Sequence, residues 1–323
     1  MRSIFRRVTS ALLATSVLFS GMAAADAPKE LRVDFAYYSP QSLVLKKFGW
    51  LEEALKGDNV PVKWVLSQGS NRALEYLNSG SIDFGSTAGL AAVLSKANGN
   101  PIKGIYLFSQ PEWTALVVGK DSTIKSVNDL KGKKIAATKG TDPYLFLLRT
   151  LHDVGLKKSD VEIVGLQHAD GRSALEQGRV DAWAGLDPLM AASQIDAGSR
   201  LLYRNVNYNT YGFLNTTEKF ANEHPDYVKK VLAAYEKARQ WILAHPDQTV
   251  QIIAEEAKIS LPVAQLQLSR NNFKNAVPGE LEKQALKAAA PILTEEDLVK
   301  KGTNVNAVID SWIDPAYAKA VIK

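Results

Sequence analysis

The chain has 323 residues, of which 46% are hydrophobic and 23% charged, a balance that supports a large buried core and excludes long disordered or collagen-like segments. It contains no cysteine, which excludes disulfide frameworks, thiolate metal sites, cysteine nucleophiles and a lipid-bearing N-terminal cysteine. The formal net charge is +5, which taken alone would suggest an anionic polymer as a partner.

The N-terminus has the pattern of a secretory signal peptide. Arg2, Arg6 and Arg7 form a basic start, which is followed by an apolar run at residues 11–19 that is too short to cross a bilayer and by an Ala-Ala-Ala cleavage site at 23–25. Cleavage there removes three arginines, so most of the formal charge of +5 belongs to the signal. Since no later apolar run approaches the roughly 20 residues of a transmembrane helix, we expect a soluble periplasmic protein.

From residue 31 onward, short apolar runs alternate with helical patterns, which is typical of an α/β protein whose sheets are mostly parallel and flanked by helices. In a first series we expect strands at residues 31–38, 62–66, 82–85 and 102–108, with helices after Pro40 and at 71–77 and 88–97. In a second series we expect strands at 133–138, 161–166 and 180–184, with helices at 143–154 and 187–197. From residue 220 the apolar spacing is helical, which predicts a helical C-terminal region.

A short internal repeat indicates two similar lobes. Residues 80–83 (Gly-Ser-Ile-Asp) match residues 178–181 (Gly-Arg-Val-Asp), and an Ala-Leu-Glu triplet precedes each segment. Both copies are typical of a helix that ends at a glycine and is followed by a strand. Two stretches rich in β-formers are the expected crossings between the lobes, residues 114–119 and 210–214. The expected division is a signal peptide at 1–25, lobe I at 26–117 with 213–323, and lobe II at 118–212.

Small polar residues follow the predicted strands, at the edge where open parallel sheets bind ligands. Glycine lets a backbone approach a ligand, Ser and Thr hydroxyls donate hydrogen bonds, and helix N-termini favour negative charge. We therefore expect a small anion in a cleft between the lobes, bound without a metal or another cofactor. The candidate ligand-binding residues are Tyr38, Ser39, Gln41, Ser86, Thr87, Trp113, Gly140, Thr141, Asp142, Trp183 and Asp187.

Each candidate also has a structural interpretation. The threonines would then only cap helices, and Trp113 and Trp183 would lie in the core instead of packing on the apolar part of a ligand. Asp142 and Asp187 each precede a proline, so they would cap helix N-termini. Their functional interpretation is a carboxylate that meets an ammonium group on a zwitterionic ligand.

The sequence has no motif of a serine hydrolase, a zinc protease, a P-loop protein or a dinucleotide-binding enzyme, so we expect that the protein is not an enzyme. The four histidines, His168 among them, have no metal-ligand spacing and are interpreted as solvated or helix-capping residues. The lysine-rich runs at 131–134 and 300–301 are interpreted as solvated surface. We expect a monomer with no nucleic acid partner.

Three segments resemble one known family. They are residues 129–136 (Asp-Leu-Lys-Gly-Lys-Lys-Ile-Ala), residues 139–149, which begin Lys-Gly-Thr and end Leu-Leu-Arg, and residues 178–188, which begin Gly-Arg-Val-Asp-Ala-Trp-Ala and end Asp-Pro. They resemble the periplasmic substrate-binding proteins of ABC importers for aliphatic sulfonates, taurine and nitrate, and the aliphatic sulfonate branch most of all. The resemblance implies a two-lobed periplasmic binding protein of type II with two hinge crossovers. Such a protein closes on its ligand and delivers it to an ABC permease in the inner membrane.

The resemblance also implies a ligand between residues 85–87 and residues 140–141, with Trp113 and Trp183 close by. The chain departs from the family pattern at two points of the expected pocket. Leu186 precedes Asp-Pro where sulfonate binders have a tryptophan, and Thr-Asp-Pro follows Lys-Gly where those proteins often have serines. The leading hypothesis is therefore a binder of a small organic anion, first of all an aliphatic sulfonate, although the ligand need not be a simple alkanesulfonate.

Other functions stay open on the sequence alone. A taurine-like zwitterion or nitrate is an alternative ligand. The related family also includes binders of pyrimidines and other vitamin precursors. A secreted enzyme on the same scaffold is a further alternative, because a fold does not fix a function.

Overall fold

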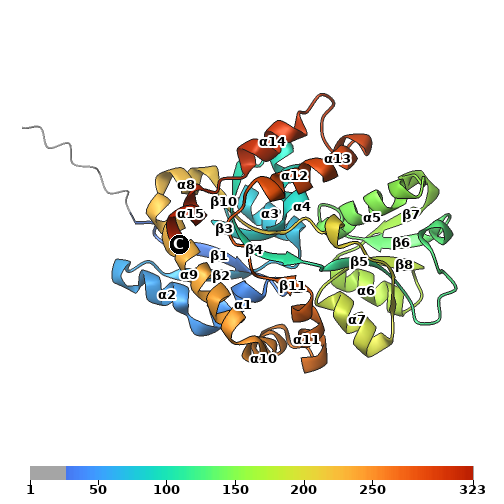
Figure 1. Cartoon of the computed structure of the whole chain (residues 1–323), viewed down its shortest axis with the longest axis horizontal. Coiled ribbons are helices and arrows are strands. Elements are labelled where there is room, and N and C mark those ends of the chain that lie inside the picture. Colours follow the sequence, from blue (N-terminus) through green and yellow to red (C-terminus); the bar gives the residue numbers. More distant parts are fainter. Residues whose placement is uncertain (1–26, 323) are drawn as a thin grey trace, which may run out of the picture.

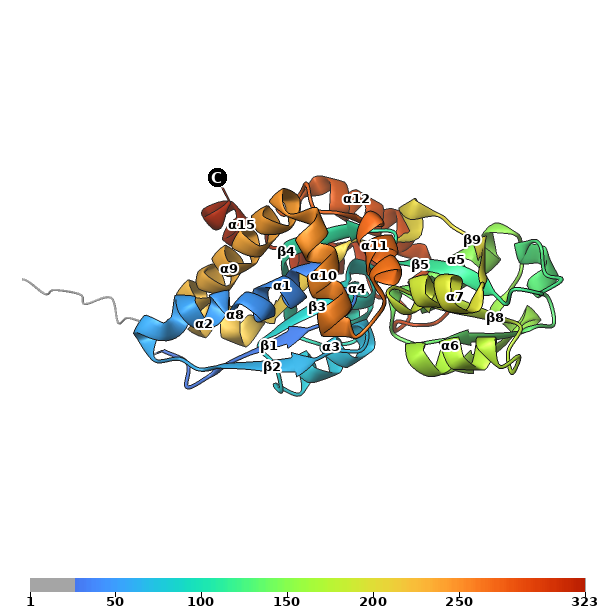
Figure 2. The same cartoon turned by 90° about the horizontal axis from the view of Figure 1, so that it is seen from below.

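Two β-sheets divide the chain into two lobes, which lie side by side along the long axis of the molecule (Figure 1). The computed structural model describes residues 27–322, so the predicted signal peptide lies outside the described residues. Helices cover both faces of each sheet (Figure 2), as the alternating pattern of the sequence predicts. No helix within residues 27–322 is long and apolar enough to cross a membrane.

The sheet of lobe I consists of β1 (Leu31–Phe35), β2 (Val62–Leu66), β3 (Phe84–Ala88), β4 (Ile102–Pro111), β10 (Gly212–Thr217) and β11 (Asn271–Asn272). Their order in space is β11-β4-β10-β3-β1-β2. β1 pairs in parallel with β2 and β3, whereas β10 lies antiparallel between β3 and β4. The strands that come late in the chain therefore run against an otherwise parallel sheet.

The sheet of lobe II consists of β5 (Thr114–Val118), β6 (Lys134–Ala137), β7 (Glu162–Gly165), β8 (Ala182–Leu186) and β9 (Arg200–Tyr203). Their order in space is β7-β6-β8-β5-β9. β6 pairs in parallel with β7 and β8, and β5 lies antiparallel between β8 and β9. In both lobes the inverted central strand is thus the one that enters directly from the other lobe.

The first crossing between the lobes lies earlier than the sequence suggested. All five residues of β5 are buried, and they pair with β8 and β9. This β-rich stretch is therefore a central strand of lobe II and not a hinge, so the predicted boundary after residue 117 is wrong by one strand. The return crossing precedes β10, close to the boundary expected at 212.

The predicted helices of the first two hundred residues are all present, and their ends shift by a few residues. They are α1 (Pro40–Phe48), α2 (Trp50–Leu55), α3 (Ser70–Asn78), α4 (Gly89–Ala97), α5 (Asp142–Asp153), α6 (His168–Glu176) and α7 (Leu189–Ala197). The one helix predicted after Pro40 is divided into α1 and α2 at Gly49, which has φ of +64°. The helical C-terminal region contains α8 (Glu218–Glu223), α9 (Pro225–Ala244), α10 (Pro246–Ala257), α11 (Leu261–Ser269), α12 (Glu280–Ala289), α13 (Pro291–Glu295), α14 (Val305–Trp312) and α15 (Ala316–Val321). Most of these later helices pack on lobe I, but α11 also contacts α7 and α13 contacts α5.

The internal repeat of the sequence is a repeated structural device. The glycines of both copies end a helix in the left-handed region, with φ of +69° and +68°. In lobe I the Asp83 carboxylate accepts a hydrogen bond from the Arg32 amide at 2.8 Å, and the Asp83 amide donates to the Arg32 carbonyl at 2.7 Å. In lobe II, Asp181 makes the same two bonds with Lys134, both 2.8 Å long. The predicted similarity of the two lobes is therefore confirmed.

Candidate ligand-binding site

The lobes meet at the carboxyl edges of their sheets, where α3 of lobe I and α6 of lobe II begin. Nδ2 of Asn71 lies 3.4 Å from Oε1 of Gln167 across this junction. A Cβ at Gly69 would lie 2.9 Å from Nε2 of His168, so the absence of a side chain at Gly69 lets the lobes approach this closely. The segments that follow β2 and β7 therefore meet at the junction, and the segment after β7 is not among the strand ends that sequence reasoning selected.

A buried ion pair joins the lobes at a second point of the junction. Nη1 of Arg270, which follows α11, donates to both carboxylate oxygens of Asp187 at 2.9 and 3.1 Å, and the two side chains are only 7% and 1% exposed. Nη2 of Arg270 donates to the side-chain oxygen of Gln194. Asp187 also accepts the Ala191 amide in the first turn of α7 at 2.9 Å, and Val263 of α11 packs in the same small apolar cluster as Ala191. Asp187 therefore holds the lobes together and caps a helix.

Asp142 braces both crossings between the lobes. Its carboxylate accepts hydrogen bonds from Nε1 of Trp113 at 3.0 Å and from the amide and hydroxyl of Thr210 at 3.0 and 2.7 Å. Trp113 lies on the first crossing and Thr210 on the return, and the Thr210 hydroxyl also accepts the Leu90 amide of α4 at 2.9 Å. Burial raises the pKa of Asp142, and the hydrogen bonds act against that rise. Trp113 and Asp142, which were both expected to contact the ligand, are hydrogen-bonded to each other.

Two candidates after β1 carry a buried polar atom without a hydrogen-bond partner in residues 27–322. Nε2 of Gln41 donates to the Phe108 carbonyl at 2.6 Å, which leaves Oε1 without a donor. Oγ of Ser39, at the start of α1, has no partner either. Both side chains are fully buried. They are the candidates of lobe I whose polar atoms are available to a ligand.

Ser86 and Thr87 lie on β3, and their hydroxyls are occupied within lobe I. The amide and the hydroxyl of Ser86 donate to the Asp34 carboxylate at 2.9 Å, and burial raises the pKa of that carboxylate to about 6. The Ser86 carbonyl accepts the Tyr38 hydroxyl at 2.8 Å. Oγ1 of Thr87 accepts a hydrogen bond from Nδ2 of Asn215 at 2.8 Å. The network therefore fixes the loop after β1 to the neighbouring strand β3.

Trp183 lies in the core of lobe II and does not reach the junction. It is fully buried on β8, and its indole packs on α6 so closely that a Cβ at Gly171 would lie 2.8 Å from Cδ1 and Nε1. Gly140, with φ of +76°, and Thr141 form the turn that leads into α5, and the Thr141 hydroxyl donates to the Thr138 carbonyl at 2.6 Å. Of these candidates in lobe II, only the turn at Gly140 and Thr141 faces lobe I.

Sequence reasoning missed His168. The interpretation as a solvated or capping residue is wrong, because the side chain is 2% exposed at the start of α6. Nδ1 lies 3.2 Å from Oγ1 of Thr138, and Nε2 has no partner among the described residues. Burial lowers the pKa of His168 to about 3. His168 follows the strand predicted at 161–166, so the rule applied to the other strand ends would have found it.

Two further residues of the junction come from the helical C-terminal region. Arg270 reaches Asp187, as described above, and Gln267 of α11 donates Nε2 to the Tyr37 carbonyl at 2.6 Å. Oε1 of the fully buried Gln267 has no partner within residues 27–322. No sequence signal marks these residues, since they follow no strand and have no motif.

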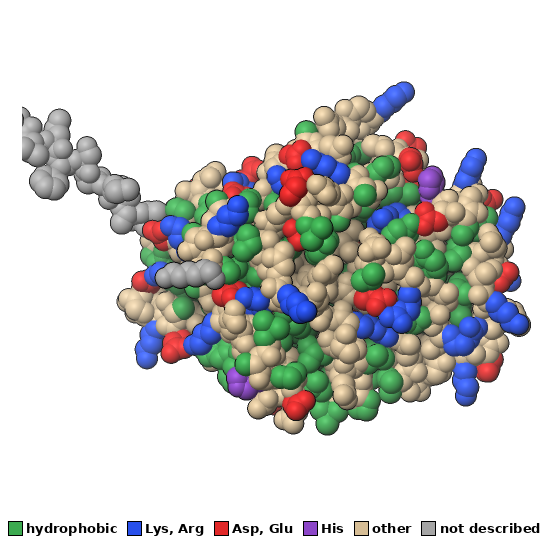
Figure 3. Space-filling model, in the orientation of Figure 1, with side chains coloured by type: hydrophobic (Ala, Val, Ile, Leu, Met, Phe, Trp, Pro, Cys, Tyr) green, Lys and Arg blue, Asp and Glu red, His purple; other side chains and the backbone are tan. Residues whose placement is uncertain are grey.

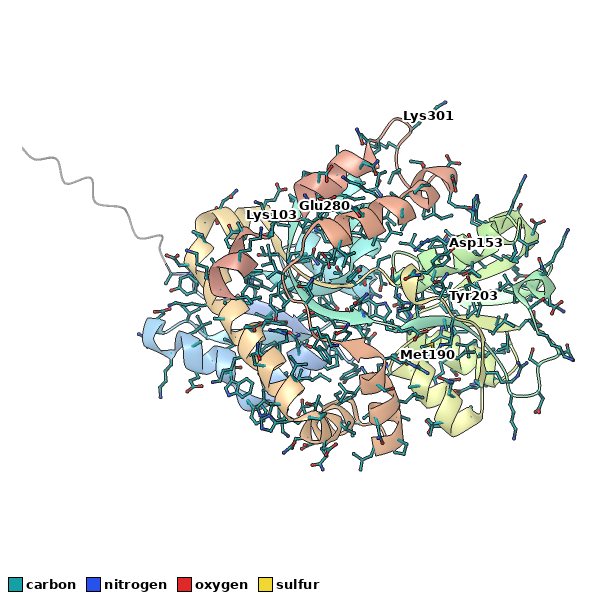
Figure 4. The ribbon with its side chains drawn as sticks, viewed as in Figure 1. Lys103, Asp153, Met190, Tyr203, Glu280 and Lys301 are labelled. Atoms are coloured by element: carbon teal, nitrogen blue, oxygen red, sulfur yellow. The ribbon has the colours of Figure 1, made fainter. Side chains whose placement is uncertain are left out.

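Away from the junction, the buried polar atoms of residues 27–322 that lack a partner include those of Asn100, Thr150, His224 and Tyr235, which lie in separate segments of the chain. A hollow of about 630 Å³ lies at the opposite edge of lobe I and is lined in part by Arg32 and Asp83, which already pair with each other. Acidic and basic side chains alternate on the face shown in Figure 3. Lys301 extends from the tip of lobe I, as Figure 4 shows, and Lys300 and Lys301 are exposed as predicted. In the described part of the chain, no cluster of histidines and carboxylates is suited to a metal ion.

Comparison with known proteins identifies relatives over most of the chain. Residues 43–249 match the NMT1/THI5-like family. A putative aliphatic sulfonates-binding protein of Escherichia coli is 30% identical over 310 residues, which cover 94% of this chain and 95% of that protein. The alkanesulfonate-binding protein SsuA of Xanthomonas axonopodis pv. citri, solved with MOPS bound, superposes with a TM-score of 0.81 at 25% identity and covers 89% of this chain and 98% of its own. The desulfurization enzyme DSZB has the same fold, with a TM-score of 0.68 at 16% identity over 91% of this chain and 99% of its own.

Proposed function

The chain belongs to the NMT1/THI5-like family, and from this membership we propose that it is the periplasmic solute-binding component of an ABC importer. It captures a small organic anion between its lobes and delivers that anion to a permease in the inner membrane. Aliphatic sulfonates are the leading ligand class, because the E. coli relative is named for them and the superposed Xanthomonas protein binds alkanesulfonates.

One observation carries the proposal: four buried polar atoms that border the junction of the lobes lack a hydrogen-bond partner within residues 27–322. Ser39 Oγ, Gln41 Oε1 and Gln267 Oε1 lie on the side of lobe I, and His168 Nε2 lies on the side of lobe II. A buried polar group that lacks a hydrogen bond costs about 1–3 kcal/mol. A ligand that binds these atoms from between the lobes removes that cost only when the lobes are together, so it favours the closed arrangement.

Helix N-termini at the junction bind the acid group of the ligand. Four helices, α1, α3, α5 and α6, begin at residues that border the junction. The first turn of each helix has amides without an intrahelical acceptor and a partial positive charge, which stabilise an anion. We assign ligand contact to Ser39, Gln41 and the turn at Gly140 and Thr141. Trp113, Asp142 and Asp187 hold the lobes in place around the ligand.

We further propose binding without turnover. The candidates for a general base at the junction are the buried carboxylates of Asp142 and Asp187 and the neutral imidazole of His168. Burial lowers the pKa of His168 to about 3, which makes the imidazole a weak base. Trp113 and Thr210 donate three hydrogen bonds to the Asp142 carboxylate, and Arg270 pairs with the Asp187 carboxylate. Because DSZB shows that an enzyme can have this fold, the test of binding includes a search for product.

The test is a calorimetric titration of protein that lacks residues 1–25, unfolded and refolded to remove any ligand acquired in the host. The panel contains alkanesulfonates, taurine, nitrate, sulfate and pyrimidines. We expect saturable binding of one organic anion per chain and recovery of that anion unchanged. Binding of no member of the panel would contradict the proposed ligand class, and recovery of a converted product would contradict binding without turnover.

Cellular location is tested separately. In a Gram-negative host that expresses the full chain, we expect periplasmic protein whose intact mass corresponds to a start at Asp26. Full-length protein that stays in the cytoplasm would contradict the assignment.

A further inference from the structure

The hydrogen bonds of His168 fix which of its ring nitrogens carries the proton. The Thr138 hydroxyl has one hydrogen and donates it to the Leu166 carbonyl at 2.7 Å. The 3.2 Å contact between Thr138 Oγ1 and His168 Nδ1 therefore requires the hydrogen on Nδ1. Since burial lowers the pKa of His168 to about 3, the ring is neutral and Nε2 presents a lone pair. The unpartnered Nε2 is a hydrogen-bond acceptor.

The two buried glutamines are also oriented by their partners. Nε2 of Gln41 donates to the Phe108 carbonyl and Nε2 of Gln267 donates to the Tyr37 carbonyl, both at 2.6 Å. A carbonyl cannot donate, so a flipped amide would place oxygen against oxygen at each position. The unpartnered Oε1 atoms of both glutamines are therefore acceptors as well. Both side chains are fully buried.

The side-chain donors at the junction, in contrast, are largely occupied, with the exception of the Ser39 hydroxyl, which has no partner within residues 27–322 and remains a donor for the acid group. The indole of Trp113 and the hydroxyl of Thr210 donate to Asp142, and the guanidinium of Arg270 donates to Asp187 and Gln194. A plain sulfonate has acceptor oxygens and an alkyl chain, so it leaves buried acceptor atoms unsatisfied. The free acceptor atoms of the junction are therefore satisfied only by a ligand that carries hydrogen-bond donors.

We propose that His168 Nε2, Gln41 Oε1 and Gln267 Oε1 accept hydrogen bonds from donor groups of the ligand. The preferred ligand is then an organic acid that also carries an amine or amide N–H. This inference rests on the proposed function and narrows its ligand class. The helix starts bind the acid group, and the three acceptors bind the N–H group. His168 is then a specificity-determining residue supplied by lobe II.

The decisive experiment compares two ligands that differ in one group, 2-aminoethanesulfonate and ethanesulfonate, by calorimetry on the refolded wild-type protein. We expect the amine to bind at least about tenfold more tightly, because a site built to pair a polar group rejects the analogue that lacks it. Equal or weaker binding of the amine would overturn the inference and leave the proposed function standing. Binding of neither compound, nor of any other anion in the panel, would overturn both.

Variants then locate the selectivity. His168→Phe keeps a ring of similar size and removes the acceptor, so we expect the ratio of the two affinities, amine over ethanesulfonate, to fall at least severalfold. The matched control is His152→Phe, since the His152 side chain is 65% exposed, and it should change neither affinity. If His168→Phe lowers the affinity for both ligands equally, so that the preference for the amine stays intact, His168 does not accept a hydrogen bond from the amine. The wild-type comparison decides the ligand class even if this variant does not fold.

Discussion

The two lobes have the same strand order and the same amino edge, but their carboxyl edges differ. The order β2-β1-β3-β10-β4 in lobe I corresponds to β7-β6-β8-β5-β9 in lobe II. Asp83 and Asp181 tie the starts of equivalent strands together in the same way. Positions that follow these aspartates can therefore be compared one by one. The comparison separates what the fold requires from what the site requires.

The position two residues after each aspartate shows what the fold requires. It is Gly85 in lobe I, where a Cβ would lie 2.9 Å from Cδ1 of Leu77 on the covering helix. In lobe II it is Trp183, and the covering helix has Gly171 beneath the indole. In lobe I the large residue is on the helix and the glycine on the strand, whereas in lobe II the large residue is on the strand and the glycine on the helix. The space between sheet and helix is filled in both cases. Trp183 belongs to packing and not to recognition.

The next position shows what the site requires. Ser86 of lobe I binds Asp34, and its carbonyl holds Tyr38, so the network fixes the loop that presents Ser39 and Gln41. In lobe II the equivalent strand positions are alanines, at residues 136 and 184. Lobe II instead contributes His168 from the start of α6. Lobe I therefore supports its part of the site from within the sheet, and lobe II supports its part from a helix.

The largest expected effect is the loss of Trp183. Trp183→Ala should lower the free energy of unfolding by about 3–5 kcal/mol, because the cavity beneath α6 cannot close. The ligand affinity of the folded variant should stay within about twofold, measured by calorimetry beside urea unfolding. A large loss of affinity with little loss of stability would mean that Trp183 contacts the ligand, and it would contradict the packing role inferred from the comparison of the lobes.

The contact between the lobes is the second test. Arg270→Ala leaves Asp187 buried without its cation and should lower the free energy of unfolding by about 3 kcal/mol. The control is Arg204→Ala, whose ion pair with Glu112 is at the surface with the arginine side chain 53% exposed, and we expect a loss of at most about 1 kcal/mol. Equal effects of the two substitutions would mean that the buried pair stabilises the protein no more than the surface pair does.

The buried ionisable groups of the two lobes predict opposite pH dependences. Burial raises the pKa of Asp34 from 3.8 to about 6, so the native state holds a proton that the unfolded chain has lost, and this contribution to stability falls as pH rises from about 4 to 6. Burial lowers the pKa of His168 from 6.5 to about 3, so the unfolded chain binds the proton first, and this contribution rises with pH over the same interval.

Two variants measure these contributions separately. Relative to wild type, Asp34→Asn should become more stable and His168→Phe less stable as pH rises from 4 to 6, each by up to about 3 kcal/mol. Urea unfolding at several pH values gives both differences. A slope near zero for either variant would show that the pKa of that group is not shifted, and slopes of the same sign would contradict one of the two shift directions.

The smallest expected effect concerns the repeated aspartates. Asp181→Ala removes one acceptor of a backbone amide and should cost about 1 kcal/mol, and Asp83→Ala should cost more because Asp83 also binds the guanidinium of Arg32 at 2.7 Å. Thermal unfolding of the two variants ranks them. A larger loss from Asp181→Ala would mean that the two copies of the device are not equivalent.

Much of the fold could be predicted from the sequence, because strand and helix periods are local properties. The repeat at Gly80 and Gly178 predicted two similar lobes, since a left-handed glycine and a paired aspartate are local requirements. The role of β5 could not be predicted, because a segment of residues with high β propensity has the same sequence pattern in a hinge as in a central strand. Pairing with β8 and β9, far along the chain, decides between them.

The proposed site could be predicted from the sequence only where its residues follow a strand. Ser39, Gln41 and Asp142 follow strands and lie at the junction, and the same rule applies to His168, which it was not used to select. Whether a polar atom is free depends on distant partners, as Thr87 shows through its bond with Asn215. Gln267 and Arg270 come from a helical region, and only the packing of α11 brings them to the junction.

The central claim is that one ligand contacts both lobes, and amide hydrogen exchange with and without the best ligand of the panel tests it most directly. The account predicts that binding slows exchange together at the starts of α1 and α3 in lobe I and at the start of α6 in lobe II. Protection confined to one lobe, or located at the hollow near Arg32, would contradict it.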